Sequence, residues 1–146
     1  LANGTEDYHL ESAITERTAA VLHFVAYAPS SDIKIERVIE IAHKHDVPVI
    51  VDAAAEFPPF SQLRRWSDMG ADITVFSGGK GIRGPQSTGL ILGRKELIEA
   101  CSMNANTNHG VGRPTKVGKE EIAGLVTAIA LFANEESEQA EIGKWV

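Results

Sequence analysis

The sequence predicts an α/β fold with a mostly parallel sheet. Two short apolar runs rich in β-branched residues, 49–51 and 73–76, are typical of buried strands. A helical pattern at 61–68 separates them, which favours a parallel crossover between neighbouring strands. Strand and helix patterns also alternate along the rest of the chain, as they do in layered α/β folds.

Breaker and capping residues place the individual elements. Pro48 ends one helix, because the residue before a proline disfavours helical backbone, and Gly70 ends another. Ser31 or Asp32 can cap the first of these helices, and Ser61 can cap the second. In chain order we expect a helix at 9–16, a strand at 19–26 with an exit loop at 27–31, a helix ending near 45–46, a strand at 49–51, a rigid connector at 56–60, a helix at 61–68, a strand at 73–76, a glycine-rich loop at 77–87, a strand at 88–92, and helices near 94–102 and 119–139.

Two of the helices carry an apolar face that we expect to pack in the core. The face of the helix before Pro48 consists of Ile35, Val38, Ile39 and Ala42. The face of the last helix consists of Ile122, Leu125, Val126, Ile129 and Phe132.

The strand at 88–92 follows its predecessor after eleven residues, 77–87, whose glycines and proline leave no room for a helix. A parallel crossover needs about a dozen residues or more, usually helical. We therefore expect this strand to run antiparallel to the others, or to lie away from the strand before it.

Composition excludes several classes of protein. The 146 residues are 43% hydrophobic and 23% charged, which is ordinary for a globular domain. The net charge of -6 argues against nucleic acid as the main partner, because phosphate binding needs clustered Lys and Arg. The single cysteine, Cys101, excludes an internal disulfide and fits a cytoplasmic protein, and the apolar runs are too short to span a bilayer. Leu1 and the residues after it resemble the interior of a polypeptide, so we expect a fragment of a longer protein.

An acid and a lysine lie at the ends of the two predicted central strands. Asp52 follows the first strand, and Lys80 lies just past the second, between Gly79 and Gly81. Parallel strands bring both residues to the carboxyl edge of the sheet, where ligands bind in open α/β folds. There a carboxylate can keep a pyridine nitrogen protonated and a partly desolvated lysine can form an imine, so the pair suits pyridoxal 5'-phosphate. The alternatives are a surface lysine and a turn-capping aspartate.

Three further residues are candidates for this site. Ala54 lies two residues after Asp52 and, in extended chain, faces the same side, where a small residue lets the cofactor ring lie flat. The Ser77 hydroxyl can bind the cofactor phosphate or cap a turn. Arg113 can bind a substrate carboxylate or phosphate, or can pair with an acid elsewhere. We expect no metal site, because two histidines two residues apart in the helix before Pro48 do not share a face.

At these residues the chain resembles the fold-type-I pyridoxal-phosphate enzymes, in the branch that contains bacterial selenocysteine synthase (L-seryl-tRNA selenium transferase) and D-glucosaminate-6-phosphate ammonia-lyase. The aspartate, the lysine and the Gly-Pro-Gln at 84–86 are together a fairly specific signal. Residues 53–56 and 113–116 are closer to the ammonia-lyase side of the branch. The segments that carry the resemblance are 10–15, 51–54, 77–80, 84–89 and 112–116.

The resemblance implies roles for the candidate residues. Lys80 would form the Schiff base, Asp52 would pair with the pyridinium nitrogen, Ser77 would lie near the phosphate and Arg113 near the substrate. It further implies a mostly parallel sheet with one antiparallel strand. Residues 1–146 would be a partial large domain, in which about 119–146 form a helix leading toward a small domain, in a homodimer or larger assembly.

The leading hypothesis is a pyridoxal-phosphate lyase that eliminates ammonia from an amino acid or amino sugar acid, with Lys80 as the general base. The first alternative is selenium transfer on seryl-tRNA, which would require a basic surface in the complete protein. The second is a non-catalytic domain that keeps the fold and uses its surface for assembly. Uptake of pyridoxal phosphate separates the first two hypotheses from the third.

Overall fold

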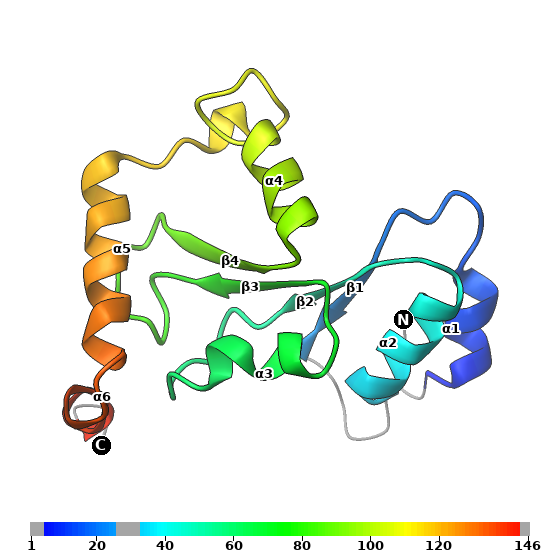
Figure 1. The fold of residues 1–146 in the computed structure, drawn as a ribbon, viewed down its shortest axis with the longest axis horizontal. Helices are drawn as coiled ribbons and strands as arrows, with labels where there is room; N and C mark the ends of the chain where they lie inside the picture. The colour runs from blue at the N-terminus through cyan, green and yellow to red at the C-terminus, as the bar shows by residue number, and fades with distance from the viewer. Residues whose placement is uncertain (1–4, 26–32, 144–146) are drawn as a thin grey trace.

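The computed structural model describes residues 5–25 and 33–143 and contains one four-stranded sheet with helices around it (Figure 1). The strand and helix patterns in the sequence correspond to observed elements, most of them within a few residues of the expected bounds. In chain order the elements are α1 (Asp7–Ala13), β1 (Val21–Phe24), α2 (Ile35–Lys44), β2 (Val49–Asp52), α3 (Gln62–Asp68), β3 (Ile73–Ser77), β4 (Gly89–Gly93), α4 (Lys95–Asn104), the short 3-10 helix Arg113–Thr115, α5 (Lys119–Phe132) and α6 (Glu135–Gly143).

The sheet has the strand order β1-β2-β3-β4, so each strand pairs with the one before it in the chain. The first three strands are parallel, and α2 and α3 form the crossovers between them. Strand β4 is antiparallel to β3, with Ser77 opposite Gly89. The prediction for 88–92 is therefore confirmed in its first form: the short loop reverses the chain instead of crossing over.

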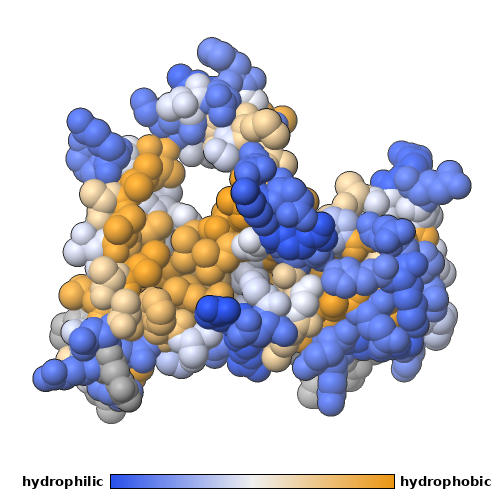
Figure 2. Space-filling model, viewed as in Figure 1, coloured by the Kyte–Doolittle hydropathy of each residue, from blue (hydrophilic) through white to orange (hydrophobic). Residues whose placement is uncertain are grey.

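The two faces of the sheet are buried to different degrees. The face that carries Val49, Val51 and Thr74 has no exposure at these residues. On the opposite face, Phe24 of β1 and Ile91 of β4 are about half exposed, at 47% and 46%. Figure 2 shows apolar side chains gathered on the side toward the viewer, between α5 and the sheet. The core of this chain therefore lies mainly on one side of the strands.

Helix α2 packs as its pattern predicts, since Val38, Ile39 and Ala42 are buried and Ile35 packs against the core. Its N-cap position is Lys34. Ser31 and Asp32, the predicted caps, lie outside the described residues, and so does the whole predicted exit loop at 27–31.

No helix in the described part of the chain is long and apolar enough to span a bilayer.

Helix α3 ends as predicted, with Gly70 in the left-handed region at φ 105°. Ser61 occupies the N-cap position but its side chain makes no capping hydrogen bond. The Ser61 backbone is already helical, and the carbonyl groups of Pro59 and Phe60 accept hydrogen bonds from the Gln62 and Leu63 N–H groups. The predicted cap position is therefore confirmed, whereas the side-chain capping hydrogen bond is absent.

The single helix expected at 119–139 is two helices, α5 and α6. Asn134 separates them, and its side-chain oxygen accepts hydrogen bonds from the N–H groups of Glu136 and Ser137, as a helix cap does. On α5, Leu125 and Phe132 are buried as expected. Ile122 and Val126 are instead 51% and 61% exposed, so the predicted core face of this helix is only partly covered in the described structure.

Candidate functional site

The predicted strand ends meet at the carboxyl edge of the sheet. Strand β2 ends at Asp52, which lies beside Val75 of β3 in the parallel register. Strand β3 continues to Ser77, and the loop after it carries Lys80. The sequence therefore predicted the placement of Asp52 and of the Lys80 loop on adjacent parallel strands.

Asp52 is half-buried and belongs to a row that crosses the whole sheet. Its register partners Phe24, Val75 and, through β3, Ile91 are all apolar. One carboxylate oxygen, Oδ1, accepts a hydrogen bond from the Ala54 N–H at 3.0 Å, which turns the chain out of the strand. The turn-capping interpretation of Asp52 is thus observed. A carboxylate accepts several hydrogen bonds, so this contact leaves capacity for a second partner.

Ala54 and Ser77 differ from the sequence expectation in detail. Ala54 is in a turn and not in extended chain, because β2 ends at Asp52, so strand alternation does not set its direction. Ser77 is the last residue of β3 and is half-buried, on the same face as Val75. The next N–H group, that of Gly78, already donates to the Thr88 carbonyl at 2.9 Å and is not available to a phosphate.

Lys80 lies in a loop that is held closely on both sides. A Cβ on Gly79 would lie 2.6 Å from the Gln86 Cα, and a Cβ on Gly81 would lie 1.7 Å from the Phe57 carbonyl oxygen. Both distances are too short for any side chain, so glycine is required on each side of Lys80. The lysine side chain itself is exposed, and the partly desolvated environment that the sequence predicts is not seen in residues 5–25 and 33–143.

The loop is also closed on itself. The Gly84 N–H donates to the Gly78 carbonyl at 2.7 Å, and the Thr88 hydroxyl donates to the Pro85 carbonyl at 2.6 Å. The Gln86 side-chain amide donates to the Gly79 carbonyl at 3.0 Å. These contacts fix the two arms of the loop relative to each other.

Helix α5 supports the loop from outside, and in Figure 1 it lies at the end of the sheet where β3 stops. Leu125 lies 3.0 Å from the position of a Cβ on Gly78. Glu121 accepts hydrogen bonds from the Ser87 hydroxyl and from the Gly118 N–H, and both lower the pKa of its carboxyl group. The same carboxylate thus caps α5 and ties it to the loop.

Arg113 is not brought to this edge within the chain. It begins the short 3-10 helix beyond the far end of α4, apart from the β3–β4 loop (Figure 1). Its guanidinium is exposed and donates to the Asn106 side-chain oxygen. The structure therefore groups Asp52, Ser77 and Lys80, and separates Arg113 from them.

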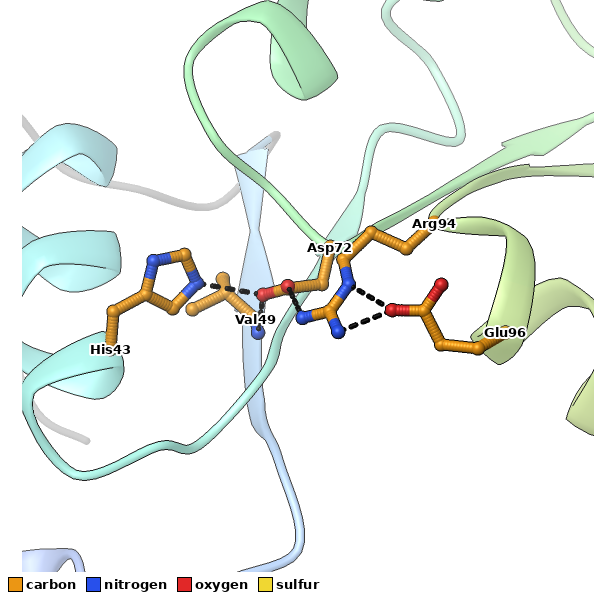
Figure 3. A network of polar contacts seen from close by, with 5 residues as sticks. All are labelled: His43, Val49, Asp72, Arg94 and Glu96. Carbon is orange, nitrogen blue, oxygen red and sulfur yellow. Dashed lines mark hydrogen bonds and ion pairs between the residues drawn. The ribbon is translucent and has the colours of Figure 1, made fainter.

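A polar cluster that the sequence did not predict lies at the opposite, amino edge of the sheet (Figure 3). Asp72 precedes β3 and is 2% exposed. Its carboxylate accepts hydrogen bonds from the Val49 N–H at 2.7 Å, from His43 at 2.8 Å and from Arg94 at 2.8 Å. Arg94 also pairs with Glu96.

Burial alone would raise the pKa of Asp72, but its hydrogen bonds from Val49, His43 and Arg94 outweigh burial and lower it. His43 of α2 is thus an Asp72 partner although its own side chain is 43% exposed. A hollow of about 440 Å³ adjoins the cluster and is lined by residues that include His43, Asp72 and Arg94. Within the described ranges no group of three or more His, Cys, Asp or Glu side chains is arranged to hold a metal ion.

The fold is shared with the fold-type-I pyridoxal-phosphate enzymes. A solved structure of D-glucosaminate-6-phosphate ammonia-lyase matches 91% of this chain and 34% of its own chain, with a TM-score of 0.80 and 36% sequence identity. The profile of the family described as "SelA: L-seryl-tRNA selenium transferase" matches residues 2–144. The chain belongs to this family, and the resemblance seen in its motifs is confirmed.

Two proteins with similar sequences are named for different reactions. A 5'-C-glycyluridine monooxygenase-decarboxylase from Streptomyces is 38% identical over 140 residues, which are 94% of this chain and 33% of the relative. A D-glucosaminate-6-phosphate ammonia lyase from Salmonella typhimurium is 40% identical over 124 residues, which are 84% of this chain and 31% of the relative. The chain thus spans about a third of the length of the curated relatives it matches.

Proposed function

We propose that this chain is part of the large domain of a pyridoxal-phosphate lyase, which eliminates ammonia from an amino acid or an amino sugar acid. The observation that carries the proposal is the placement of Asp52 and the Lys80 loop at the carboxyl edge of two adjacent parallel strands. The 40% identity to an ammonia lyase supports the reaction class.

The residues at this edge fit pyridoxal phosphate by their chemistry. Asp52 offers a carboxylate in a row of the sheet whose other members, Phe24, Val75 and Ile91, are apolar. Lys80 offers an exposed amine. Ser77 offers a hydroxyl at the end of β3, and the small Ala54 lies two residues after Asp52. These are the groups that would hold a ring nitrogen, an aldehyde and a phosphate.

When bound, pyridoxal phosphate withdraws electrons from the α-carbon of an amino substrate. Asp52 would hold the proton on the ring nitrogen, because its carboxylate is fixed by the Ala54 N–H and keeps further acceptor capacity. Lys80 would hold the cofactor through its amine and, once a substrate amine displaces it, would take the proton from the α-carbon. Ser77 would donate a hydrogen bond to the phosphate.

Arg113 would reach a substrate at Lys80 only through an assembly, because it lies apart from the loop within one chain. We therefore include in the proposal a homodimer or larger homo-oligomer, in which Arg113 binds a substrate carboxylate or phosphate. Residues from about 119 onward would lead toward a small domain in the complete protein.

The test is cofactor attachment in the natural full-length protein. We expect visible absorbance with pyridoxal phosphate, and a borohydride-stable label on the peptide that contains Lys80. Lys80→Ala should abolish label and turnover, whereas Asp52→Ala should keep the label and slow proton removal. An unlabelled wild-type protein would refute the proposal and favour a non-catalytic assembly domain.

The reaction is tested separately from the cofactor. We expect ammonia release without oxygen, with D-glucosaminate 6-phosphate as the first compound tried because a relative is named for it. Oxygen uptake with carbon dioxide release would instead favour the second candidate, an oxygen-dependent decarboxylation, which the 38% identity to a monooxygenase-decarboxylase supports. Salt-sensitive binding of seryl-tRNA would favour selenium transfer.

A further inference from the structure

Gln86 bridges the two arms of the loop that carries Lys80. Its side-chain amide donates to the carbonyl of Gly79, seven residues earlier, at 3.0 Å. The side chain is exposed, so water competes for the same carbonyl and the bond adds little to the stability of the fold. Its position next to Lys80 suggests a role other than stability.

Among the residues that the structure describes, the Gln86 amide is the one side-chain donor that orients the Gly79–Lys80 peptide from the opposite arm. Glycine has no Cβ and rotates about φ and ψ more freely than any other residue. On the other side of Lys80, Gly81 packs directly against the Phe57 backbone, whose carbonyl oxygen would lie 1.7 Å from a Cβ at Gly81. On the Gly79 side the close neighbours are the Cα and side chain of Gln86, at 2.6 and 2.5 Å from a Cβ position.

A peptide plane is rigid, so the direction of the Gly79 carbonyl determines where the Lys80 Cα lies and how its side chain leaves the loop. An amine that must meet an aldehyde at one point depends on this direction, since a displacement of about 1 Å can cost a large factor in rate. Holding the carbonyl therefore holds the amine.

We propose that Gln86 is a positioning residue for Lys80: its amide fixes the Gly79–Lys80 peptide so that the lysine amine is presented in one orientation. The inference rests on the proposed function of Lys80 and adds a residue that acts through the backbone. Gln86 itself need not touch the cofactor or the substrate.

The experiment uses the natural full-length apoprotein and pyridoxal phosphate. Gln86→Met keeps the length of the side chain and removes the donor, and Gln86→Glu places a carboxylate beside the Gly79 carbonyl. The matched control is Gln139→Met, the same change at an exposed position in α6. For each protein we would measure the rate of borohydride-stable labelling at Lys80, the visible circular dichroism per bound cofactor, and the melting temperature of the apoprotein.

We expect both Gln86 variants to label Lys80 about tenfold more slowly and to show weaker visible dichroism per bound cofactor, with an unchanged melting temperature; tenfold corresponds to about 1.4 kcal/mol. The control should match the wild type. Wild-type rates and dichroism in Gln86→Met, or losses that only follow a lower melting temperature, would overturn the inference while the proposed function stands. Absence of label in the wild type would overturn both.

Discussion

We expect the polar cluster around Asp72 to contribute strongly to the stability of the fold, because one carboxylate connects β2, α2 and the residue before α4. Asparagine has the shape of aspartate but only one acceptor oxygen. In the wild type, Oδ2 accepts from Val49 and His43, and Oδ1 accepts from Arg94. In Asp72→Asn the amide group must therefore face at least one of these donors.

The magnitude follows from burial. The Asp72 side chain is 3% exposed and Val49 is fully buried, so a donor left without a partner there costs about 1–3 kcal/mol. Loss of the charge adds less, because the Arg94 and His43 side chains are 56% and 43% exposed and water screens their attraction. We expect the free energy of unfolding to fall by roughly 2–4 kcal/mol in Asp72→Asn.

Urea unfolding of the natural full-length protein measures this loss. The matched control is Asp68→Asn in α3, whose side chain is 65% exposed and forms only a 4.0 Å pair with Arg64. The control should unfold at the wild-type urea concentration and Asp72→Asn well below it. Equal midpoints for all three proteins would refute the view that the cluster holds the amino edge of the sheet.

The same carboxylate sets a dependence on pH. The pKa of Asp72 is lowered on folding, so its charged form stabilises the folded state at pH values above the unfolded pKa of about 4. That stability is lost as pH falls through the lowered folded pKa. The difference in unfolding free energy between wild type and Asp72→Asn should therefore be full near neutral pH and shrink below about pH 4. A difference that is constant down to acid pH would contradict the assigned role of the charge.

Two further substitutions test the support of the Lys80 loop. Gly81→Ala places a Cβ 1.7 Å from the Phe57 carbonyl oxygen and should cost about 1–3 kcal/mol and slow cofactor attachment, whereas Gly143→Ala, with nothing within 4 Å, should be neutral in both assays. Phe132→Ala removes a side chain that is 2% exposed and packs edge-to-face on Phe57, so thermal or urea unfolding should show a loss of about 3–5 kcal/mol. Val126→Ala, at a 61% exposed position of the same helix, should change little, and an equal loss there would contradict the assigned core.

The fold was predictable where the local residue pattern and the length of a connecting loop determine it. The β-branched runs located β2 and β3. The eleven-residue loop was too short for a crossover, which predicted that β4 would be antiparallel or lie away from β3, and the structure shows the antiparallel pairing. The break between α5 and α6 had a signal in Asn134, a good cap, but residues that favour helix, such as Glu and Gln, follow it and predicted one continuous helix. The exposure of Ile122 and Val126 depends on what lies opposite α5, and helical periodicity does not contain that information.

The candidate site was predictable in part for a similar reason. Asp52 and Lys80 follow strands, so their edge of the sheet could be deduced from topology. In the polar cluster, Asp72 contacts Arg94, which is 22 positions away in the sequence, and His43, which is 29 positions away. Local residue spacing does not reveal contacts over such separations. The Gln86 bridge likewise depends on the conformation of the loop and not on residue type alone.

The strand order has a consequence for synthesis of the protein on the ribosome. Because each strand pairs with the strand before it, β2, β3 and β4 can each add to the growing sheet as soon as they emerge. The arms of the Lys80 loop can therefore close before α5 is made. Leu125 and Glu121 reach the loop only afterwards, so we expect the final rigidity of the site to be acquired late, when α5 leaves the exit tunnel and docks.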